Sequence, residues 1–234
     1  MKTTSISFKE FLESYNKIII PDVQRDYVMG SGGEKLEKLF KAMADNKSEN
    51  FRFSCIVGHK DKDNNLYIYD GQQRMATLIF LCSFLDKNRE QKDLYERFSF
   101  KGRDEANRWI VDSQKIKDSK EVDFTTYSIK KLINVFESDC LESDTGKRKP
   151  CDIIDMDFLL NKVSFDMVLV DKVSDAEQFF LDINDGLDLK PYEIFKAELY
   201  HHANEIFPNE KDVFKRISLK MENEWLELCL KYNN

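Results

Sequence analysis

With 234 residues, 41% of them hydrophobic and 34% charged, the chain is long enough and apolar enough to bury a substantial core, which excludes a disordered protein. Its net charge of −7 argues against a protein that coats DNA nonspecifically, and five cysteines without a Cys-x-x-Cys pair argue against a zinc knuckle or a disulfide framework. The sequence has neither a signal-peptide pattern nor an apolar run of the ~20 residues that span a bilayer, so we expect a cytoplasmic protein without a membrane partner.

Helical and strand patterns alternate along the chain. Apolar residues recur at helical spacing in several segments, whereas short β-branched and aromatic runs that end at Pro, Gly or Asp are typical of strands. A polar stretch at residues 59–65 separates two such runs and predicts a hairpin. We predict strands at residues 18–20, 51–58, 66–70 and 165–171, and helices at residues 8–15, 34–45, 72–86, 103–116, 125–138, 155–163 and 176–183 and within about 191–231.

This order of elements predicts a single α/β domain over residues 1–234. Its core is a small mixed sheet near the N-terminus, with helices inserted into it and appended to it. The highly charged stretch at about residues 88–150 is predicted as a mostly helical insertion, and the helices at about residues 191–231 as a C-terminal addition.

The most informative stretch joins a predicted strand to the helix that follows it. At the junction stand Asp70, Gly71, Gln72, Gln73 and Arg74. The unpaired N–H groups and partial positive charge of a helix N-terminus suit an anion such as a phosphate, and Arg74 adds a fork of donors at the same place. The two Gln side chains are neutral hydrogen-bonding groups that suit a ligand or a water. In the alternative interpretation, Asp70 caps the helix, Gly71 supplies a turn conformation and Arg74 forms an ordinary surface ion pair.

Two further polar clusters flank this junction in the sequence. Residues 21–27, Pro-Asp-Val-Gln-Arg-Asp-Tyr, follow the first strand and, taken alone, are typical of a solvated loop. Residues 184–196 begin with Asn-Asp-Gly, which ends a helix, and Pro191 then starts the next one. Lys196 lies one helical turn after Tyr192, so the two share a face that could also meet a ligand.

In this order, the three clusters resemble the N-terminal half of the GmrSD-type restriction proteins, whose ParB/sulfiredoxin-like domain carries an Asp-Gly-Gln-Gln-Arg hallmark. The similarity runs from about residue 18 to residue 196, with departures at Val23, at the spacing between Asn184 and Gly186, and at Glu193. The matching residues are Gln24, Arg25 and Tyr27 in the first motif, Asp70, Gly71, Gln72, Gln73 and Arg74 in the second, and Asn184, Gly186, Leu189 and Lys196 in the third.

The resemblance implies a ParB/sulfiredoxin-like core that binds a nucleoside triphosphate at residues 70–74, with Mg²⁺ as a candidate metal. It also implies a link to the restriction of modified or foreign DNA. The nuclease activity of this family resides in a C-terminal His-Asn-His domain, but the chain has three His, and His201-His202 have no matching Asn or further His at suitable spacing. We therefore expect no nuclease activity from this chain, and contact with DNA only through a partner or a missing nuclease domain.

We predict a nucleotide-binding, NTP-hydrolysing domain of a restriction or anti-phage defence protein, which regulates a nuclease carried elsewhere. Phosphoryl transfer depends on positioning and charge stabilisation rather than on a strong base, and the sequence has no P-loop motif. A noncatalytic module that senses nucleotide or nucleic acid, or a protein–protein adaptor, is the alternative, and the oligomeric state stays open. The predicted catalytic residues are Asp70 (also the metal ligand), Gln72, Gln73 and Arg74, and the predicted nucleotide contacts are Gln24, Arg25, Tyr27, Gly71, Arg74, Asn184 and Lys196.

Overall fold

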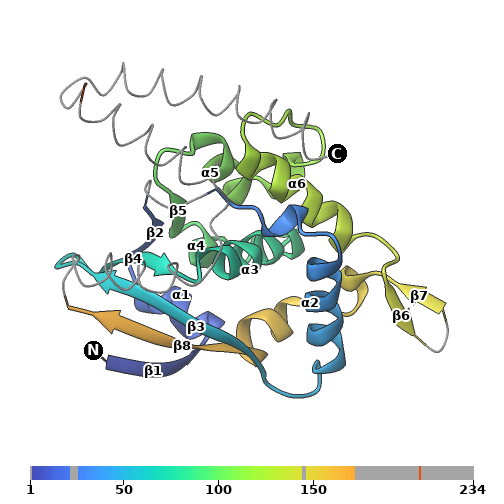
Figure 1. Ribbon diagram of the computed structural model, residues 1–234, viewed down its shortest axis with the longest axis horizontal. Helices are drawn as coiled ribbons and strands as arrows, with labels where there is room; N and C mark the ends of the chain where they lie inside the picture. Colours follow the sequence, from blue (N-terminus) through green and yellow to red (C-terminus); the bar gives the residue numbers. More distant parts are fainter. Residues whose placement is uncertain (1, 22–25, 144–145, 172–205, 207–234) are drawn as a thin grey trace.

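A computed structural model describes residues 2–21, 26–143, 146–171 and 206 (Figure 1). The predicted helices after residue 171, and the third motif with them, lie outside these residues. Gln24 and Arg25 of the first motif also lie outside, whereas the whole 70–74 segment is described.

A six-stranded mixed sheet, in the order β1-β8-β3-β4-β2-β5, forms the centre of the fold. Strands β2, β4 and β5 run parallel to one another, β3 runs antiparallel to β4, and β8 is parallel to β3 and antiparallel to β1. The predicted mixed α/β class is therefore confirmed. The strands are β1 (Lys2–Ser7), β2 (Lys17–Ile20), β3 (Phe51–Lys60), β4 (Asn65–Asp70), β5 (Phe98–Phe100) and β8 (Val163–Val170).

Helix α3 is the central helix of the fold. Most of its side chains are buried on every face, because it lies between the sheet and the layer that α5 and α6 form (Figure 1). The remaining helices carry polar residues on their outer faces. The helices are α1 (Phe8–Ser14), α2 (Glu34–Asp45), α3 (Gln72–Leu85), α4 (Lys92–Tyr95), α5 (Asp104–Val111) and α6 (Phe124–Phe136), with short turns η1 (Met29–Ser31), η2 (Ser113–Lys115), η3 (Pro150–Asp152) and η4 (Phe158–Lys162).

Side-chain caps fix the start of two of these helices. Ser7 and Glu10 form a reciprocal capping box at α1, and Asp123 and Thr126 form one at α6. The α6 box is buried, with Asp123 Oδ1 accepting a hydrogen bond from Thr126 N at 2.7 Å. Thr125, between the two residues of this box, bonds Asp26 and the Tyr27 amide, so the beginning of α6 lies beside the loop that follows β2.

The stretch at about residues 88–150, predicted as a mostly helical insertion, contains a strand that was not predicted. β5 lies inside this stretch and pairs in parallel with β2, so the stretch also completes one edge of the main sheet. Three residues are too few to establish a strand period, so β5 was not predicted. The same stretch also contains a short hairpin of β6 (Leu141–Ser143) and β7 (Gly146–Arg148).

Two further differences concern a shortened helix and a strand that was not predicted. The helix predicted at residues 155–163 is shorter and finishes in the wide turn η4, and the N-terminal strand β1 was not predicted. The predicted 59–65 hairpin between β3 and β4 is confirmed.

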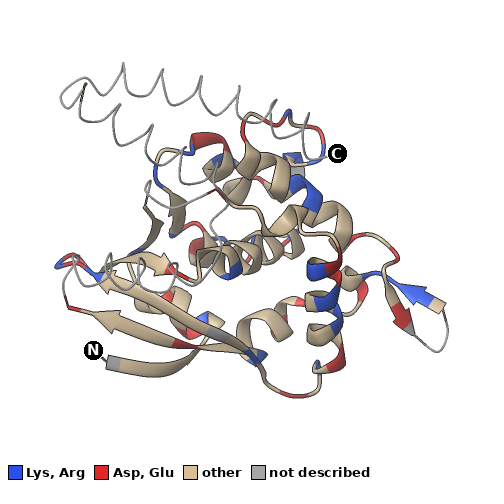
Figure 2. Cartoon of the chain, in the orientation of Figure 1, with Lys and Arg blue, Asp and Glu red and all other residues tan. Residues whose placement is uncertain are grey.

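In Figure 2 the charged residues gather on helices, turns and the β6–β7 hairpin, and the strands of the six-stranded sheet are mostly uncharged. Among the described residues, no helix is long and apolar enough to cross a membrane.

Candidate functional site

Three parallel strands have their carboxyl ends on the same side of the sheet, and a polar segment follows each of them. We call this side, at the carboxyl ends of β2, β4 and β5, the carboxyl edge. Because β2, β4 and β5 are neighbours and parallel, their carboxyl ends lie side by side, as the carboxyl ends do where ligands bind in open α/β sheets. Asp70 ends β4 and residues 71–74 follow it, and Asp26 and Tyr27 stand in the connection after β2. Arg103 follows β5.

Gly71 forms the turn between β4 and α3. Its φ of +85° lies in the left-handed region, and a Cβ added there would stand 2.2 Å from Ile56 Cδ1 and 3.2 Å from the Cys55 carbonyl oxygen. Gly71, rather than Asp70, occupies the N-cap position of α3, and no side chain caps this end. The turn therefore presents the first N–H groups of a 14-residue helix at the edge of the sheet.

Asp70 and Arg74 form an ion pair across the turn. Arg74 Nη2 lies 3.2 Å from Asp70 Oδ2, and the two side chains are 24% and 30% exposed. The pair is thus half-buried and reachable from solvent. The guanidinium of Arg74 donates to Asp70 with one of its five N–H groups.

Gln73 connects the turn to the loop that follows β2. Its Oε1 accepts hydrogen bonds from Val28 N at 2.8 Å and Met29 N at 3.1 Å, and its Nε2 donates to the Asp26 carbonyl oxygen at 2.7 Å. These contacts span more than forty residues of sequence, since the partners are 44 to 47 positions away. We predicted this side chain as a group that positions water, and the structure shows it holding the backbone of residues 26–29.

Tyr27 lies behind the turn in the core. It is 1% exposed, and its hydroxyl lies 2.8 Å from Thr77 Oγ1 on the second turn of α3. Burial raises the pKa of this phenol well above its usual range. The predicted nucleotide contact is therefore a buried residue, and the interpretation of residues 21–27 as a solvated loop is wrong for Asp26 and Tyr27.

The other predicted residues divide into two groups. Gln72, the first residue of α3, is 6% exposed, so its side chain faces the interior. The remaining predicted contacts, Gln24, Arg25, Asn184 and Lys196, lie outside the described residues.

Arg103 is a residue of this edge that the sequence analysis missed. Its Nη2 lies 3.3 Å from Asp26 Oδ1, and the two side chains are 12% and 8% exposed. Thr125 Oγ1 on α6 donates to the same carboxylate oxygen at 3.3 Å and accepts from Tyr27 N at 3.2 Å. The one available signal was the Phe-Ser-Phe alternation followed by Lys-Gly-Arg, which is a short strand and a turn.

The pKa values of two nearby side chains, Cys55 and Asp123, show how this part of the protein affects negative charge. The pKa of the Cys55 thiol is raised by burial and by the charge of Asp70, and lowered by Arg74. Desolvation raises the pKa of the Asp123 carboxyl, hydrogen bonds from Thr126 oppose this shift, and the charge of Asp26 adds to it. Negative charge is therefore already costly in the interior beneath the edge, whereas Arg74 favours it at the surface.

The described part of the chain contains no group of three or more His, Cys, Asp and Glu side chains that could hold a metal ion by themselves. Asp70 can supply one oxygen ligand. Mg²⁺ is commonly held by one or two carboxylates together with substrate phosphates, so Asp70 fits that manner of binding.

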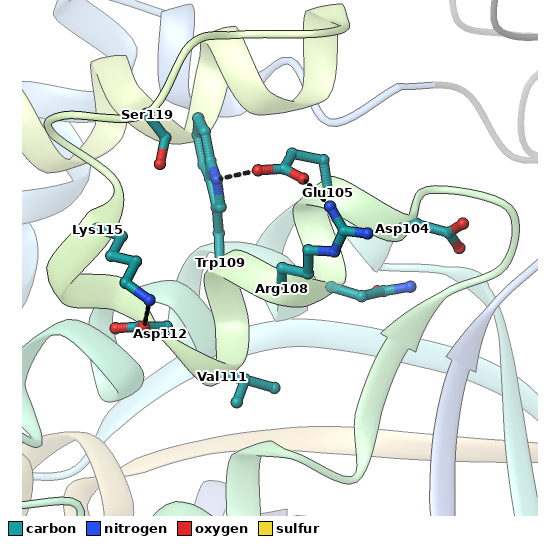
Figure 3. Close-up of a pocket in the computed structure, with 9 residues that line it drawn as sticks. Asp104, Glu105, Arg108, Trp109, Val111, Asp112, Lys115 and Ser119 are labelled. Carbon is teal, nitrogen blue, oxygen red and sulfur yellow. Dashed lines mark hydrogen bonds and ion pairs between the residues drawn. The ribbon is translucent and has the colours of Figure 1, made fainter.

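A separate hollow lies on the surface over α5 and η2 (Figure 3). Its charged groups pair with one another: Glu105 accepts from Arg108 at 2.9 Å and from Trp109 Nε1 at 3.1 Å, and Lys115 lies 2.7 Å from Asp112. None of the predicted site residues lines it. The 70–74 edge is therefore the better candidate for function.

Residues 8–200 match the family model of the GmrSD restriction endonuclease, N-terminal domain. This match covers most of the chain and all three motifs. The chain belongs to this family, and it is thus a domain related to restriction and defence. No curated protein matches the chain significantly.

Proposed function

We propose that the chain binds a nucleoside triphosphate at the carboxyl edge of β4 and β2, and that this binding regulates a nuclease carried by a partner or by another domain. The observation that carries the proposal is the turn at residues 70–74. It combines the open N-terminus of α3 with a half-buried Arg74, and both favour an anion.

The residues of the turn have distinct tasks in this proposal. The N–H groups at the start of α3 and the guanidinium of Arg74 hold phosphate oxygens. The small Gly71 allows the phosphates to approach the backbone. Asp70 would supply one oxygen ligand to Mg²⁺, and the ion would neutralise phosphate charge. Gln24, Arg25, Asn184 and Lys196 are the further contacts that the family motifs suggest.

Hydrolysis of the bound nucleotide is the finer proposal. It requires a residue that positions the attacking water. Gln73 bonds the backbone of residues 26–29, and Gln72 is buried, so either would need to change its contacts to take this role. This observation favours a second candidate, a noncatalytic module that senses nucleotide and changes its contacts with DNA-cleaving partners.

Thermal unfolding with ATP, GTP, CTP or UTP, each with and without Mg²⁺, tests the proposal. A ligand at 100 times its Kd stabilises a protein by about 2.7 kcal/mol, so we expect a clear rise in melting temperature with at least one triphosphate. Arg74→Ala should abolish the rise. Arg108→Ala is the matched control, because Arg108 is an exposed arginine on α5 in a comparable short-range ion pair. No shift with any triphosphate would contradict nucleotide binding by this chain.

Phosphate release then separates the two candidates. Turnover by the wild type that is lost in Arg74→Ala identifies a hydrolase. Stabilisation by a triphosphate without release of phosphate identifies the sensing module.

A further inference from the structure

We infer that Arg103 is a positioning residue of the proposed nucleotide site: it holds the loop after β2 against α3 through Asp26. The inference rests on the proposed function and extends it to a part of the chain that carries none of the three motifs. In this inference the stretch at residues 88–150 supports the site through Arg103.

Arg103 reaches the edge because β5 ends beside β2. Lys101 N donates to the carbonyl oxygen of Ile20, the last residue of β2, at 2.9 Å. Gly102 then turns the chain with a φ of +78°, and Arg103 follows one residue later. Its guanidinium lies over the ring of Phe100, with Cζ 5.8 Å from the ring centroid. The side chain is thus fixed on one side by an aromatic ring before it meets Asp26.

Asp26 is the point at which this arginine acts on the loop. A buried carboxylate is costly unless it is paired and hydrogen-bonded, and Asp26 receives both an ion pair from Arg103 and a hydrogen bond from Thr125. The carbonyl oxygen of the same residue accepts from Gln73 Nε2. One residue of the loop is therefore bound from β5, from α6 and from α3 at once.

The consequence concerns the start of α3. Gln73 is the second residue of this helix, and its amide bonds residues 26, 28 and 29 of the loop. If Arg103 is replaced, the buried carboxylate of Asp26 loses the positive charge that compensates it, and the loop is held less firmly against α3. Gln73 belongs to the turn at residues 70–74, which is the proposed phosphate site. We therefore expect Arg103 to affect nucleotide affinity without contacting the nucleotide.

Three variants test this role in the full chain. Arg103→Met removes the charge and keeps a long apolar stem, Arg103→Lys keeps the charge but not the fork, and Arg108→Met is the matched exposed control on α5. The Kd for ATP, GTP, CTP and UTP, each with Mg²⁺, is measured by isothermal titration calorimetry at a temperature where each variant is folded. The melting temperature is measured without nucleotide, and hydrogen exchange is followed at the amides of Val28 and Met29.

We expect Arg103→Met to raise the Kd for the preferred triphosphate about tenfold, which corresponds to the free energy of roughly one hydrogen bond. Arg103→Lys should recover part of this affinity, and Arg108→Met should leave it unchanged. The Val28 and Met29 amides should exchange faster in Arg103→Met. If Arg103→Met does not fold, Arg103→Lys carries the same test. Thr125→Val, which removes the hydroxyl that bonds both Asp26 and the Tyr27 amide, weakens the same connection from α6.

A purely structural role would lower the melting temperature and leave the Kd of the folded protein unchanged, and that result would overturn the inference alone. Failure of the wild type to bind any triphosphate would overturn the proposed function first, and with it the nucleotide role of Arg103. The two failures are thus distinguished by the wild-type titration.

Discussion

The turn at Gly71 gives the sharpest prediction for stability. Alanine in the left-handed region costs about 1–2 kcal/mol, and the change also removes some freedom from the unfolded chain, which offsets about 0.4–1 kcal/mol of that cost. In addition, the new Cβ would stand 2.2 Å from Ile56 Cδ1, and Ile56 is 1% exposed in a packed core. Displacing a packed side chain costs at least ~1 kcal/mol. We therefore expect Gly71→Ala to lower the free energy of unfolding by about 2 kcal/mol.

Gly102→Ala is the matched control for this measurement. Gly102 has a φ of +78°, close to that of Gly71, but nothing lies within 4 Å of its added Cβ. Urea unfolding followed by circular dichroism should show a loss below about 1 kcal/mol for Gly102→Ala. Ile56→Val, which removes Cδ1, should recover part of the Gly71→Ala loss in the double variant. Equal losses at Gly71 and Gly102 would refute the close packing of the turn against β3.

Three further changes test the network behind the turn by urea unfolding. Gln73→Glu replaces the amide that donates to the Asp26 carbonyl oxygen at 2.7 Å with an acceptor, so we expect a loss of about 1–2 kcal/mol at neutral pH that shrinks when Glu is protonated; an unchanged stability would contradict the connection. Tyr27→Phe removes a buried hydroxyl 2.8 Å from Thr77 Oγ1, and should cost about 1 kcal/mol because Thr77 still bonds the Gln73 carbonyl oxygen. Burial raises the pKa of Asp123 above its ordinary 3.8, so the folded state holds this proton more tightly than the unfolded state. Stability that Asp123 contributes at low pH is therefore lost as the pH rises above about 4. The free energy of unfolding of Asp123→Asn should rise relative to that of the wild type between acidic and neutral pH. A fall relative to the wild type over the same range would contradict the burial of this carboxyl.

Local sequence chemistry was sufficient to predict the turn itself. An aromatic and β-branched run that ends at Asp-Gly before a long apolar segment specifies a strand, a left-handed glycine and a helix, and β4, Gly71 and α3 follow that order. The hairpin of β3 and β4 was predictable for the same reason, because its polar connection separates two strand-like runs.

Contacts between distant segments were beyond such reasoning. The bonds of Gln73 to residues 26–29 depend on the parallel pairing of β2 and β4, and no local pattern shows which strands are neighbours. Arg103 was missed because β5 is three residues long and stands in a charged stretch that reads as helical. The burial of Asp26 and Tyr27 follows from the same neighbours, since α6 covers them through Thr125.

The most direct test of the nucleotide site is the response of the backbone amides of Gly71, Gln72, Gln73 and Arg74 in nitrogen-15 NMR spectra as a triphosphate with Mg²⁺ is added. The account predicts that these amides shift together and saturably, and that the corresponding amides of Arg74→Ala shift far less at the same concentration. Saturable shifts elsewhere, with the 71–74 amides unmoved, would contradict a phosphate site at the start of α3.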